Sequence, residues 1–306
     1  MNSPRFDKKH LILGFGIFLL LISAWGVYYF GFRAGRVPSQ FDGDRALEDV
    51  RYQTGLGPRV PGSEAHTRVI DWITSELAAA GWRTSLQDTA MMGHPVKNII
   101  ARRPSSQDSD LPWIIVGAHY DSRLLADQDR EPSKRSRPVP GANDGASGVA
   151  VLMELARILP RDLQKNVWLV FFDAEDNGNI PSWDWILGSR AFVDGLQGKP
   201  DAAIIVDMIG DADLNIYMER NSTPTLSVEI WKQAADLGYS AEFIPVPKYN
   251  MLDDHTPFLQ AGIPAADLID FDYPYWHTTE DTVDKVSARS LQIVGQTLAT
   301  WLVGNR

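Results

Sequence analysis

Short, mostly apolar runs that alternate with helix-periodic segments place the strongest constraint on the fold of this chain. Such runs are typical of strands buried on both faces, and strands separated by helices pair into a mostly parallel sheet. The expected strands cover residues 96–102, 113–119, 167–173, 202–208 and 265–271. The expected helices cover residues 64–80, 145–159, 185–196, 224–237 and 287–302. We therefore predict a single three-layer α/β domain, with a mixed, mostly parallel central sheet flanked by helices.

A second constraint comes from residues 11–32, which run for 22 positions without a charged side chain. A helix of that length spans roughly 33 Å, enough to cross a bilayer. The apolar core of a cleaved signal peptide is shorter, so we predict an uncleaved transmembrane anchor. The chain then divides into a short tail (1–10), the anchor (11–32), a linker with a first helix (33–50) and a globular domain (51–306).

Charge is distributed unevenly between the two ends of the chain. The first 36 residues carry five Lys or Arg against one Asp, a net +4, which leaves −14 for the remainder of a chain whose total is −10. An acidic domain argues against nucleic acid as a partner and against close contact with an anionic membrane surface. The absence of cysteine excludes disulfides and thiolate chemistry. Basic residues flank the anchor on both sides, so the positive-inside bias is slight; we expect a single-pass protein with its globular domain outside the cytoplasm.

Histidine and acidic residues follow the ends of the expected strands. In open α/β sheets ligands bind at the carboxyl ends of strands, so these side chains are expected to converge. The candidates are His119, Asp144, Asp176, Asp207 and His277. Imidazole and carboxylate groups are the donors that zinc takes in proteins, and a catalytic zinc keeps one position open. Glu175, directly before Asp176, would lie beside the metal and be free to move protons.

Several of these residues also have a purely structural interpretation. Asp144 could be the N-cap of the following helix, His119 a hydrogen-bonded core histidine, and Asp176 a surface acid. His255 is expected only to hydrogen-bond and hold its loop. Asp207 is harder to explain this way, because an acid that ends an apolar strand is costly unless it is paired or binds a metal. The combination is far more specific than its members and indicates a catalytic metal site.

Long motifs in the chain resemble those of a known superfamily. They are GPRVPGS, VGAHYDSR, GANDGASGVAVLMELAR, FFDAEDNG, DMIG, DDHTPFLQAGIPAADLI and YWHTTEDT. In this order and spacing they resemble the zinc exopeptidases, the superfamily that contains bacterial aminopeptidases and animal-type glutaminyl-peptide cyclotransferases. The resemblance runs from about Gly57 to the C-terminus, which makes residues 51–306 a zinc exopeptidase-like catalytic domain.

The resemblance implies roles for the candidate residues. In a two-zinc aminopeptidase the five ligands would be His119, Asp144, Asp176, Asp207 and His277. Asp144 would then bridge the two ions and Glu175 would be the base. In a cyclase one zinc would be held by Asp144, Asp176 and His277, while Glu175 and Asp207 take part in catalysis.

The position of Asp253 separates the two groups of enzymes. By resemblance, aminopeptidases carry a small residue such as serine there, whereas cyclases carry an aspartate that would share protons with Glu175 and Asp207. Three tryptophans point the same way. Trp183 and Trp185 lie in a segment that resembles the tryptophan-containing segment of cyclases, and Trp276 matches their Trp-His pair. All three tryptophans are expected to bind substrate. Packing within a loop would also explain Trp183 or Trp185.

Two positions depart from the vertebrate cyclases. Arg123 stands where those enzymes have lysine, and Asp267 stands where they have a second histidine near the site. The hydrogen bonds around the metal ligands are therefore expected to differ from theirs.

The sequence thus predicts a zinc-dependent glutaminyl-peptide cyclotransferase, which converts N-terminal glutamine of peptides or proteins to pyroglutamate and releases ammonia. One zinc ion is expected. The alternative is a membrane-anchored aminopeptidase with two zinc ions that removes N-terminal residues from peptides. A third interpretation, a binding ectodomain on an inactive peptidase scaffold, would be marked by missing site residues, and none is missing. The expected partners are peptide or protein N-termini and, through residues 11–32, a membrane.

Overall fold

The computed structural model describes residues 40–103 and 111–304. The predicted anchor, residues 11–32, lies outside this range. Within the described residues, no helix combines the length and apolar character that crossing a bilayer requires.

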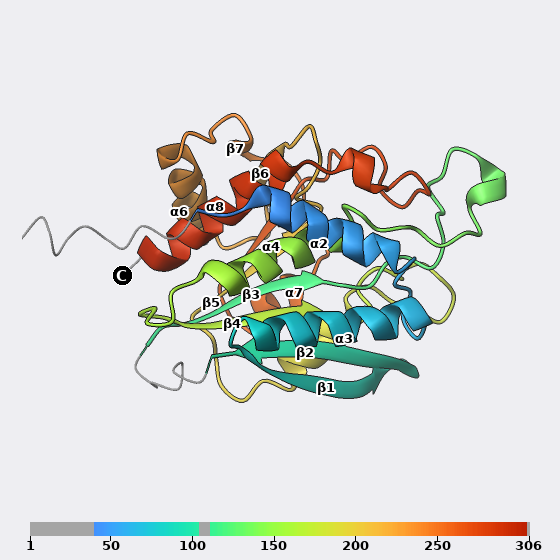
Figure 1. The fold of residues 1–306 in the computed structure, drawn as a ribbon, viewed down its shortest axis with the longest axis horizontal. Coiled ribbons are helices and arrows are strands. Elements are labelled where there is room, and N and C mark those ends of the chain that lie inside the picture. Colours follow the sequence, from blue (N-terminus) through green and yellow to red (C-terminus); the bar gives the residue numbers. More distant parts are fainter. Residues whose placement is uncertain (1–39, 104–110, 305–306) are drawn as a thin grey trace, which may run out of the picture. The chain divides into compact units, whose positions relative to one another are not determined.

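A six-stranded sheet forms the centre of the domain (Figure 1). Its strands are β1 (Arg83–Met91), β2 (His94–Arg102), β3 (Trp113–His119), β4 (Asn166–Phe172), β5 (Ala202–Asp207) and β8 (Ala265–Ile269), in the order β1-β2-β4-β3-β5-β8. β4, β3, β5 and β8 pair in parallel, whereas β2 is antiparallel to both of its neighbours. A separate two-stranded sheet contains β6 (Ile216–Met218) and β7 (Phe243–Pro247). The prediction of a mixed, mostly parallel sheet is confirmed.

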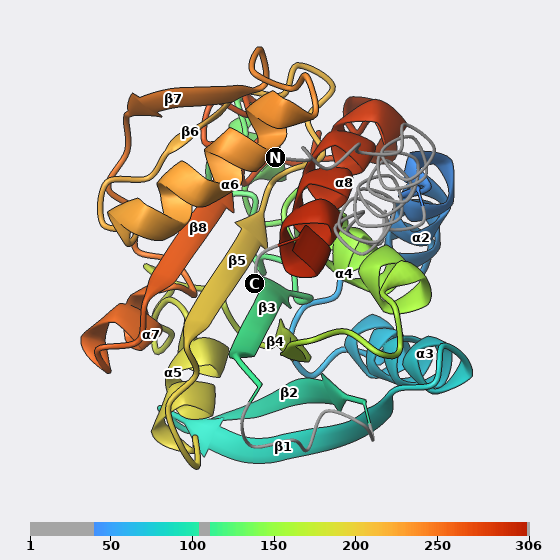
Figure 2. The same cartoon turned by 90° about the vertical axis from the view of Figure 1, so that its left-hand side faces the viewer.

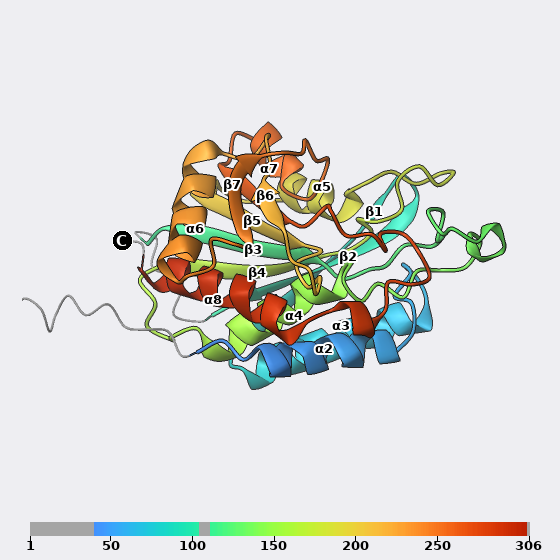
Figure 3. The same ribbon diagram turned by 90° about the horizontal axis from the view of Figure 1, so that it is seen from above.

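Helices cover both faces of the sheet (Figures 2 and 3). One face carries α2 (Gly43–Gly55), α3 (Glu64–Ala79), α4 (Ala146–Ile158) and α8 (Ala288–Gly304), and the other carries α5 (Leu187–Asp194) and α7 (Thr256–Gln260). The remaining helices are α6 (Pro224–Asp236) and the short 3-10 turns η1 (Pro132–Lys134) and η2 (Val283–Lys285). Each of the ten elements predicted with bounds is present, with ends shifted by at most two residues.

Alternation along the buried strands divides the core into two layers. Ile114, Val116 and Ala118 of β3 pack into the larger layer, while Ile115 packs into the smaller one on the opposite face. Successive side chains of a strand point to opposite faces, so a strand covered on both sides must be apolar at nearly every position. This explains why the central strands were recognisable from composition alone.

The edge strand β1 was not predicted, and its sequence explains why. RTSLQDTAM has mostly exposed or half-buried side chains, because only one side of this strand pairs and one face meets solvent. The chain passes from β3 to β4 on one side and later to β5 on the other side of β3. Such a reversal opens a crevice at the carboxyl ends of the strands.

Candidate active site

His119, the last residue of β3, faces carboxylates with both ring nitrogens. Its Nε2 lies 3.1 Å from Asp144 Oδ1 and 3.2 Å from Asp207 Oδ1, and its Nδ1 lies 3.4 Å from Asp121 Oδ1. Burial lowers the pKa of His119, but hydrogen bonds to these three carboxylates raise it by more, to well above its ordinary value. We call His119, Asp144 and Asp207 the first triad.

His277 makes a similar arrangement with a second pair of acids. Its Nε2 lies 2.8 Å from Asp176 Oδ1 and 3.6 Å from Asp144 Oδ2. We call Asp144, Asp176 and His277 the second triad, so that Asp144 belongs to both. In each triad the three donor atoms lie within 4.8 Å of one another, and all the residues are buried.

The donor atoms fit a metal ion. Asp176 Oδ2 is buried and has no hydrogen-bond partner. Burial, then the neighbouring Asp144, raise the pKa of Asp176 to about 6, which shows how costly these packed negative charges are without a cation. Imidazole nitrogen and carboxylate oxygen are donors that zinc uses in its catalytic sites. The five predicted ligands therefore come together, and zinc is the ion that their chemistry suits.

Two of the structural interpretations are wrong. The residue before α4 is Gly145 and no side chain caps this helix, so Asp144 turns toward the imidazoles instead of acting as an N-cap. Gly145 has φ +92°, and a Cβ there would lie 2.6 Å from the carbonyl oxygen of Asp121. Asp176 is 1% exposed and is not a surface acid.

Backbone turns with positive φ carry several of these side chains to the site. Ala174 precedes Glu175 with φ +52°, Met208 follows Asp207 with φ +47°, and His277 itself has φ +55°. This left-handed region is sparsely populated by residues other than glycine. Each turn therefore directs a functional side chain into the crevice at a conformational cost.

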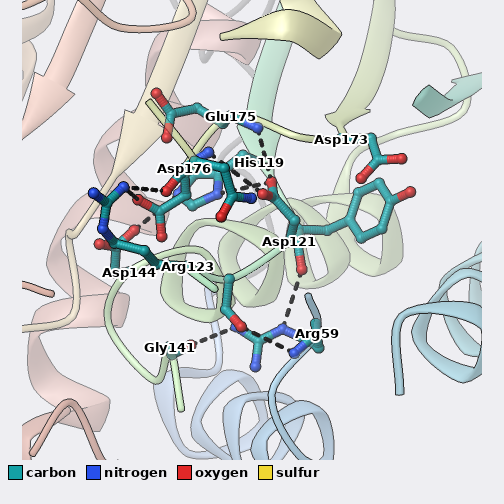
Figure 4. Close-up of polar contacts among 12 residues, drawn as sticks. Arg59, His119, Asp121, Arg123, Gly141, Asp144, Asp173, Glu175 and Asp176 are labelled. Carbon is teal, nitrogen blue, oxygen red and sulfur yellow. Dashed lines mark hydrogen bonds and ion pairs between the residues drawn. The ribbon is translucent and has the colours of Figure 1, made fainter. Parts of the chain in front are cut away.

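Two further carboxylates support the ligands, and we did not predict their roles. Asp121 accepts hydrogen bonds from the backbone amides of Glu175 (3.1 Å) and Asp176 (3.4 Å) (Figure 4). Asp281 accepts from the amides of Asn143 (2.8 Å) and Asp144 (3.1 Å). Both residues occur within recognised motifs, VGAHYDSR and YWHTTEDT, but only the structure shows which amides they hold.

The three predicted catalytic acids line the same cavity. Burial, and then the nearby charges of Asp253 and Asp176, raise the pKa of Glu175 well above its ordinary value. Burial likewise raises the pKa of Asp207 to about 7, with Asp144 and Asp253 adding to the effect and His119 opposing it. Asp253 is 4% exposed, and its Oδ2 has no hydrogen-bond partner. Burial and neighbouring charges thus favour the protonated forms of Glu175 and Asp207.

The cavity has a volume of about 190 Å³ and one wall of aromatic rings. Trp276 stacks on the ring of His277 with centroids 3.7 Å apart, and Trp185 lies nearly parallel to the same ring at 5.8 Å. Gly178 leaves room for Trp185, since a Cβ there would lie 2.0 Å from the indole. Trp183 does not line this cavity; it stacks on His94 at the β1–β2 turn.

Comparison with known families agrees with this geometry. The model of Peptidase family M28 matches residues 98–302, which is more than half of the chain and spans both triads. The chain belongs to peptidase family M28. Relatives of this M28 protein include both cyclases and aminopeptidases, so the family alone does not choose between the two reactions.

Three relatives illustrate this range. The glutaminyl cyclase of Bacteroides thetaiotaomicron, solved with N-acetylhistamine, has a TM-score of 0.82 and 30% identity, over 88% of this chain and 100% of that chain. A leucine aminopeptidase precursor from the same organism has a TM-score of 0.83 and 30% identity, over 89% and 100%. The glutaminyl-peptide cyclotransferase-like protein of Bos taurus is 26% identical, over 88% of this chain and 78% of that protein.

In this M28 protein a second group of buried acids, which we call the inner acid cluster, begins at the cavity wall and comprises Asp253, Asp254 and Asp267. Burial raises the pKa of both Asp254 and Asp267 well above the ordinary value, and the charge of Asp253 adds to it in each case. His255 lies 3.3 Å from Glu219 Oε2 and 3.6 Å from Asp267 Oδ2, away from both triads. His255 thus contacts two buried acids, although neither of its ring nitrogens meets hydrogen-bond geometry, and its role in holding the loop stays a prediction.

Proposed function

We propose that this M28 protein is a glutaminyl-peptide cyclotransferase that uses zinc and acts on the N-terminal glutamine of peptides or proteins. The observation that carries the proposal is the position of Asp253, whose carboxylate lines the same cavity as Glu175 and Asp207. An aminopeptidase has no evident use for a third buried carboxyl group beside its metal ligands. A cyclase must move protons from an amine to departing ammonia, which such a group can do.

The metal would be held by the second triad, Asp144, Asp176 and His277. When bound, zinc would polarise the carbonyl of the γ-carboxamide, and its charge would favour the ionised form of Glu175. The same family contains solved cyclase structures that resemble this chain over most of its length.

Proton movement is assigned to Glu175. It would take a proton from the substrate α-amine as the amine nitrogen forms a bond to the carbonyl carbon of the γ-carboxamide, Cδ. It would return a proton to the nitrogen that leaves as ammonia when the carbon–nitrogen bond of the amide breaks. A carboxyl group with a raised pKa suits both steps, and burial beside Asp253 and Asp176 supplies that shift.

The walls of the cavity suit a glutaminyl side chain. Trp185 and Trp276 provide flat surfaces beside His277, and Met208 and Ile269 add apolar contacts. A narrow apolar slot with a few convergent polar groups binds and orients a short amide side chain. Trp183 stacks on His94 outside the cavity, so substrate binding is proposed only for Trp185 and Trp276.

The test uses purified full-length protein loaded with zinc and two substrates in parallel. A glutaminyl peptide is assayed for ammonia, and a leucyl anilide is assayed for amine release. Ammonia with an intact peptide chain supports the cyclase. Amine release without ammonia contradicts the proposal and leaves Asp253 without a catalytic role.

The aminopeptidase remains the second candidate because the first triad is also complete, with His119 Nε2 near both Asp144 and Asp207. An aminopeptidase would use Glu175 to activate a water between two ions. Zinc analysis of the purified protein separates the two: about one ion per chain is expected for the cyclase and about two for the aminopeptidase.

We also propose that residues 11–32 anchor the protein in a membrane with its catalytic domain outside the cytoplasm. The protein should then sediment with membranes after carbonate washing. Protease added to intact cells, or to sealed vesicles of the same orientation, should digest the catalytic domain, and protease added to inside-out vesicles should not. Release by the wash would contradict anchoring, and protection in outward-facing samples would contradict the orientation.

A further inference from the structure

The loop formed by residues 123–129 lies against the segment that carries His277. The backbone amide of Gln128 donates a 3.2 Å hydrogen bond to the carbonyl of His277. Asp129 accepts hydrogen bonds from Thr279, at 3.0 Å from its amide and 2.6 Å from its hydroxyl. These contacts hold the backbone at the carbonyl of His277 and two residues after it, next to a ligand whose own φ is +55°.

Arg123 ties this loop to the other side of the second triad. Its guanidinium is 1% exposed and donates from Nε and Nη2 to the two carboxylate oxygens of Asp127, at 2.9 and 2.7 Å. Nη1 donates to the carbonyl oxygen of Asp176 at 2.6 Å, and Nη2 donates also to the carbonyl of Gly178 at 3.0 Å. The contact between Arg123 and Asp176 is visible in Figure 4.

Only a planar group with several separate donors can make all these contacts. A lysine, with one nitrogen at this position, could not hold both oxygens of Asp127 and the two carbonyls together. The guanidinium of Arg123 therefore fixes the carboxylate of Asp127 in one orientation.

That carboxylate faces the ring of His277. Asp127 Oδ1 lies 3.7 Å from His277 Nδ1, while Nε2 of the same ring lies 2.8 Å from Asp176. The first triad has an equivalent arrangement, with Asp121 behind Nδ1 of His119. A carboxylate behind one ring nitrogen fixes the tautomer of a metal-binding histidine and orients its ring.

We propose that Asp127, fixed by Arg123, is a positioning residue for His277 that directs the Nε2 lone pair of this imidazole toward the metal. The proposal concerns how the second triad binds its ion and stands whichever of the two reactions the protein performs. Because the side chain of Asp127 is 37% exposed, its substitution is expected to change metal binding much more than folding.

The experiment measures zinc affinity of the full-length, metal-free protein by competition with a chromogenic chelator. Asp127→Asn should weaken zinc binding by about tenfold, the lower end of the effect of removing a carboxylate behind a ligand histidine. Asp236→Asn is the matched control, because it removes a carboxylate from an exposed pair with Lys232 on α6. The control should bind zinc as the unmodified protein does.

A second readout separates positioning from a general loss of structure. The visible spectrum of the cobalt-substituted protein should change in Asp127→Asn and stay unchanged in Asp236→Asn, and Asp127→Glu should restore part of the affinity. If Asp127→Asn does not fold, Asp127→Ser, which also removes the carboxylate and leaves Arg123 and its contact with Asp176 in place, provides the same test, with zinc binding again weakened by about tenfold. Zinc affinity within twofold of the unmodified protein, or an equal loss in the control, would overturn the proposal.

Discussion

Asp144 of the second triad and Asp254 of the inner acid cluster are the same residue type at the same depth, yet their pKa values shift in opposite directions. Asp144 is 2% exposed and Asp254 is fully buried. Burial raises the pKa of each, but the hydrogen bond and charge of His119 outweigh burial at Asp144, so its pKa falls below the ordinary value. At Asp254 the charge of Asp253 adds to burial, and the smaller opposing effects of Ser189 and His119 do not offset them, so its pKa is raised strongly.

The difference shows that burial alone does not make an acid a metal ligand. At Asp144 two histidines offset burial and favour the ionised form, whereas at Asp254, beside Asp253, the protonated form is favoured. Asp207 of the first triad and Asp253 of the inner acid cluster both line the cavity. The proposed reaction needs both kinds of acid, one to hold zinc and one to hold protons.

The largest contrast is expected between Asp144→Asn and Asp254→Asn. The first removes the carboxylate shared by both triads, so zinc affinity should fall by more than about 100-fold and turnover should be lost. The second replaces a neutral acid by a neutral amide of similar shape, so zinc content should stay and stability should change by about 1 kcal/mol or less. Zinc analysis and thermal unfolding of both variants check this. Loss of zinc from Asp254→Asn would show that the inner acid cluster is ionised.

The second prediction concerns catalysis without metal loss. Glu175→Gln should lower kcat by about 10³, because a positioned general base commonly contributes 10² to 10⁴. Zinc content should be unchanged, since Glu175 belongs to neither triad. Asp267→Asn serves as comparison and should retain kcat within a few-fold. Ammonia release from a glutaminyl peptide is the measurement, and a near-normal rate for Glu175→Gln would remove this residue from the mechanism.

The third prediction is the pH dependence of stability in the metal-free protein. Asp254 and Asp267 have raised pKa values, so above the ordinary pKa of 3.8 the folded state holds protons that the unfolded state releases. The stability they contribute is present below pH 3.8 and is lost as pH rises through the raised pKa, by about 1.4 kcal/mol per pH unit for each proton.

The double variant Asp254→Asn and Asp267→Asn should flatten this slope. Asp144 has the opposite sign, because its lowered pKa gives stability above pH 3.8 that is lost as pH falls. Urea unfolding of the metal-free proteins between pH 4 and pH 8 measures the slope due to Asp254 and Asp267, and extending the series below pH 3.8 measures the loss due to Asp144. An unchanged slope in the double variant would contradict the assignment of protons to these two acids.

The smallest expected effect is a change in KM, which compares a tryptophan inside the cavity with one outside it. Trp276→Leu should raise KM about tenfold, or about 1.4 kcal/mol, because its ring lines the cavity beside His277. Trp183→Leu should change KM by less than about twofold, since this ring stacks on His94 outside the cavity. Steady-state kinetics on a glutaminyl peptide test the pair. Equal effects would mean that the substrate extends to the β1–β2 turn.

Much of the fold was predictable from sequence because the central strands are buried on both faces and therefore apolar throughout. Four of the candidate ligands were also predictable, since His119, Asp176 and Asp207 end or follow a strand and Asp144 precedes a helix at the carboxyl edge of the sheet, whereas His277 was found from the motif YWHTTEDT. β1 could not be found this way, because its side chains are mostly exposed or half-buried and it contains no apolar run.

The supporting contacts were not predictable from local pattern. Asp127 and Asp281 lie far along the chain from most of the atoms they support, and one loop acid looks like another until the fold brings it to an amide or a ring. Trp183 shows that a motif can also suggest a role in the site for a residue that lies outside it. It lies two residues from Trp185 in a motif that suggested a shared role, but the turn directs only Trp185 to the cavity.

The left-handed residues beside the site have a consequence for how such a protein can change over time. Ala174 and Met208 each hold a conformation that glycine would adopt more easily, at a cost on the order of 1–3 kcal/mol per residue. Selection for heat resistance alone would favour relaxing these turns. A variant that no longer needs catalytic activity could therefore gain thermal stability while the carboxylates beside these turns move away from their catalytic positions. Thermostabilisation of this enzyme is best sought far from the carboxyl edge of the sheet.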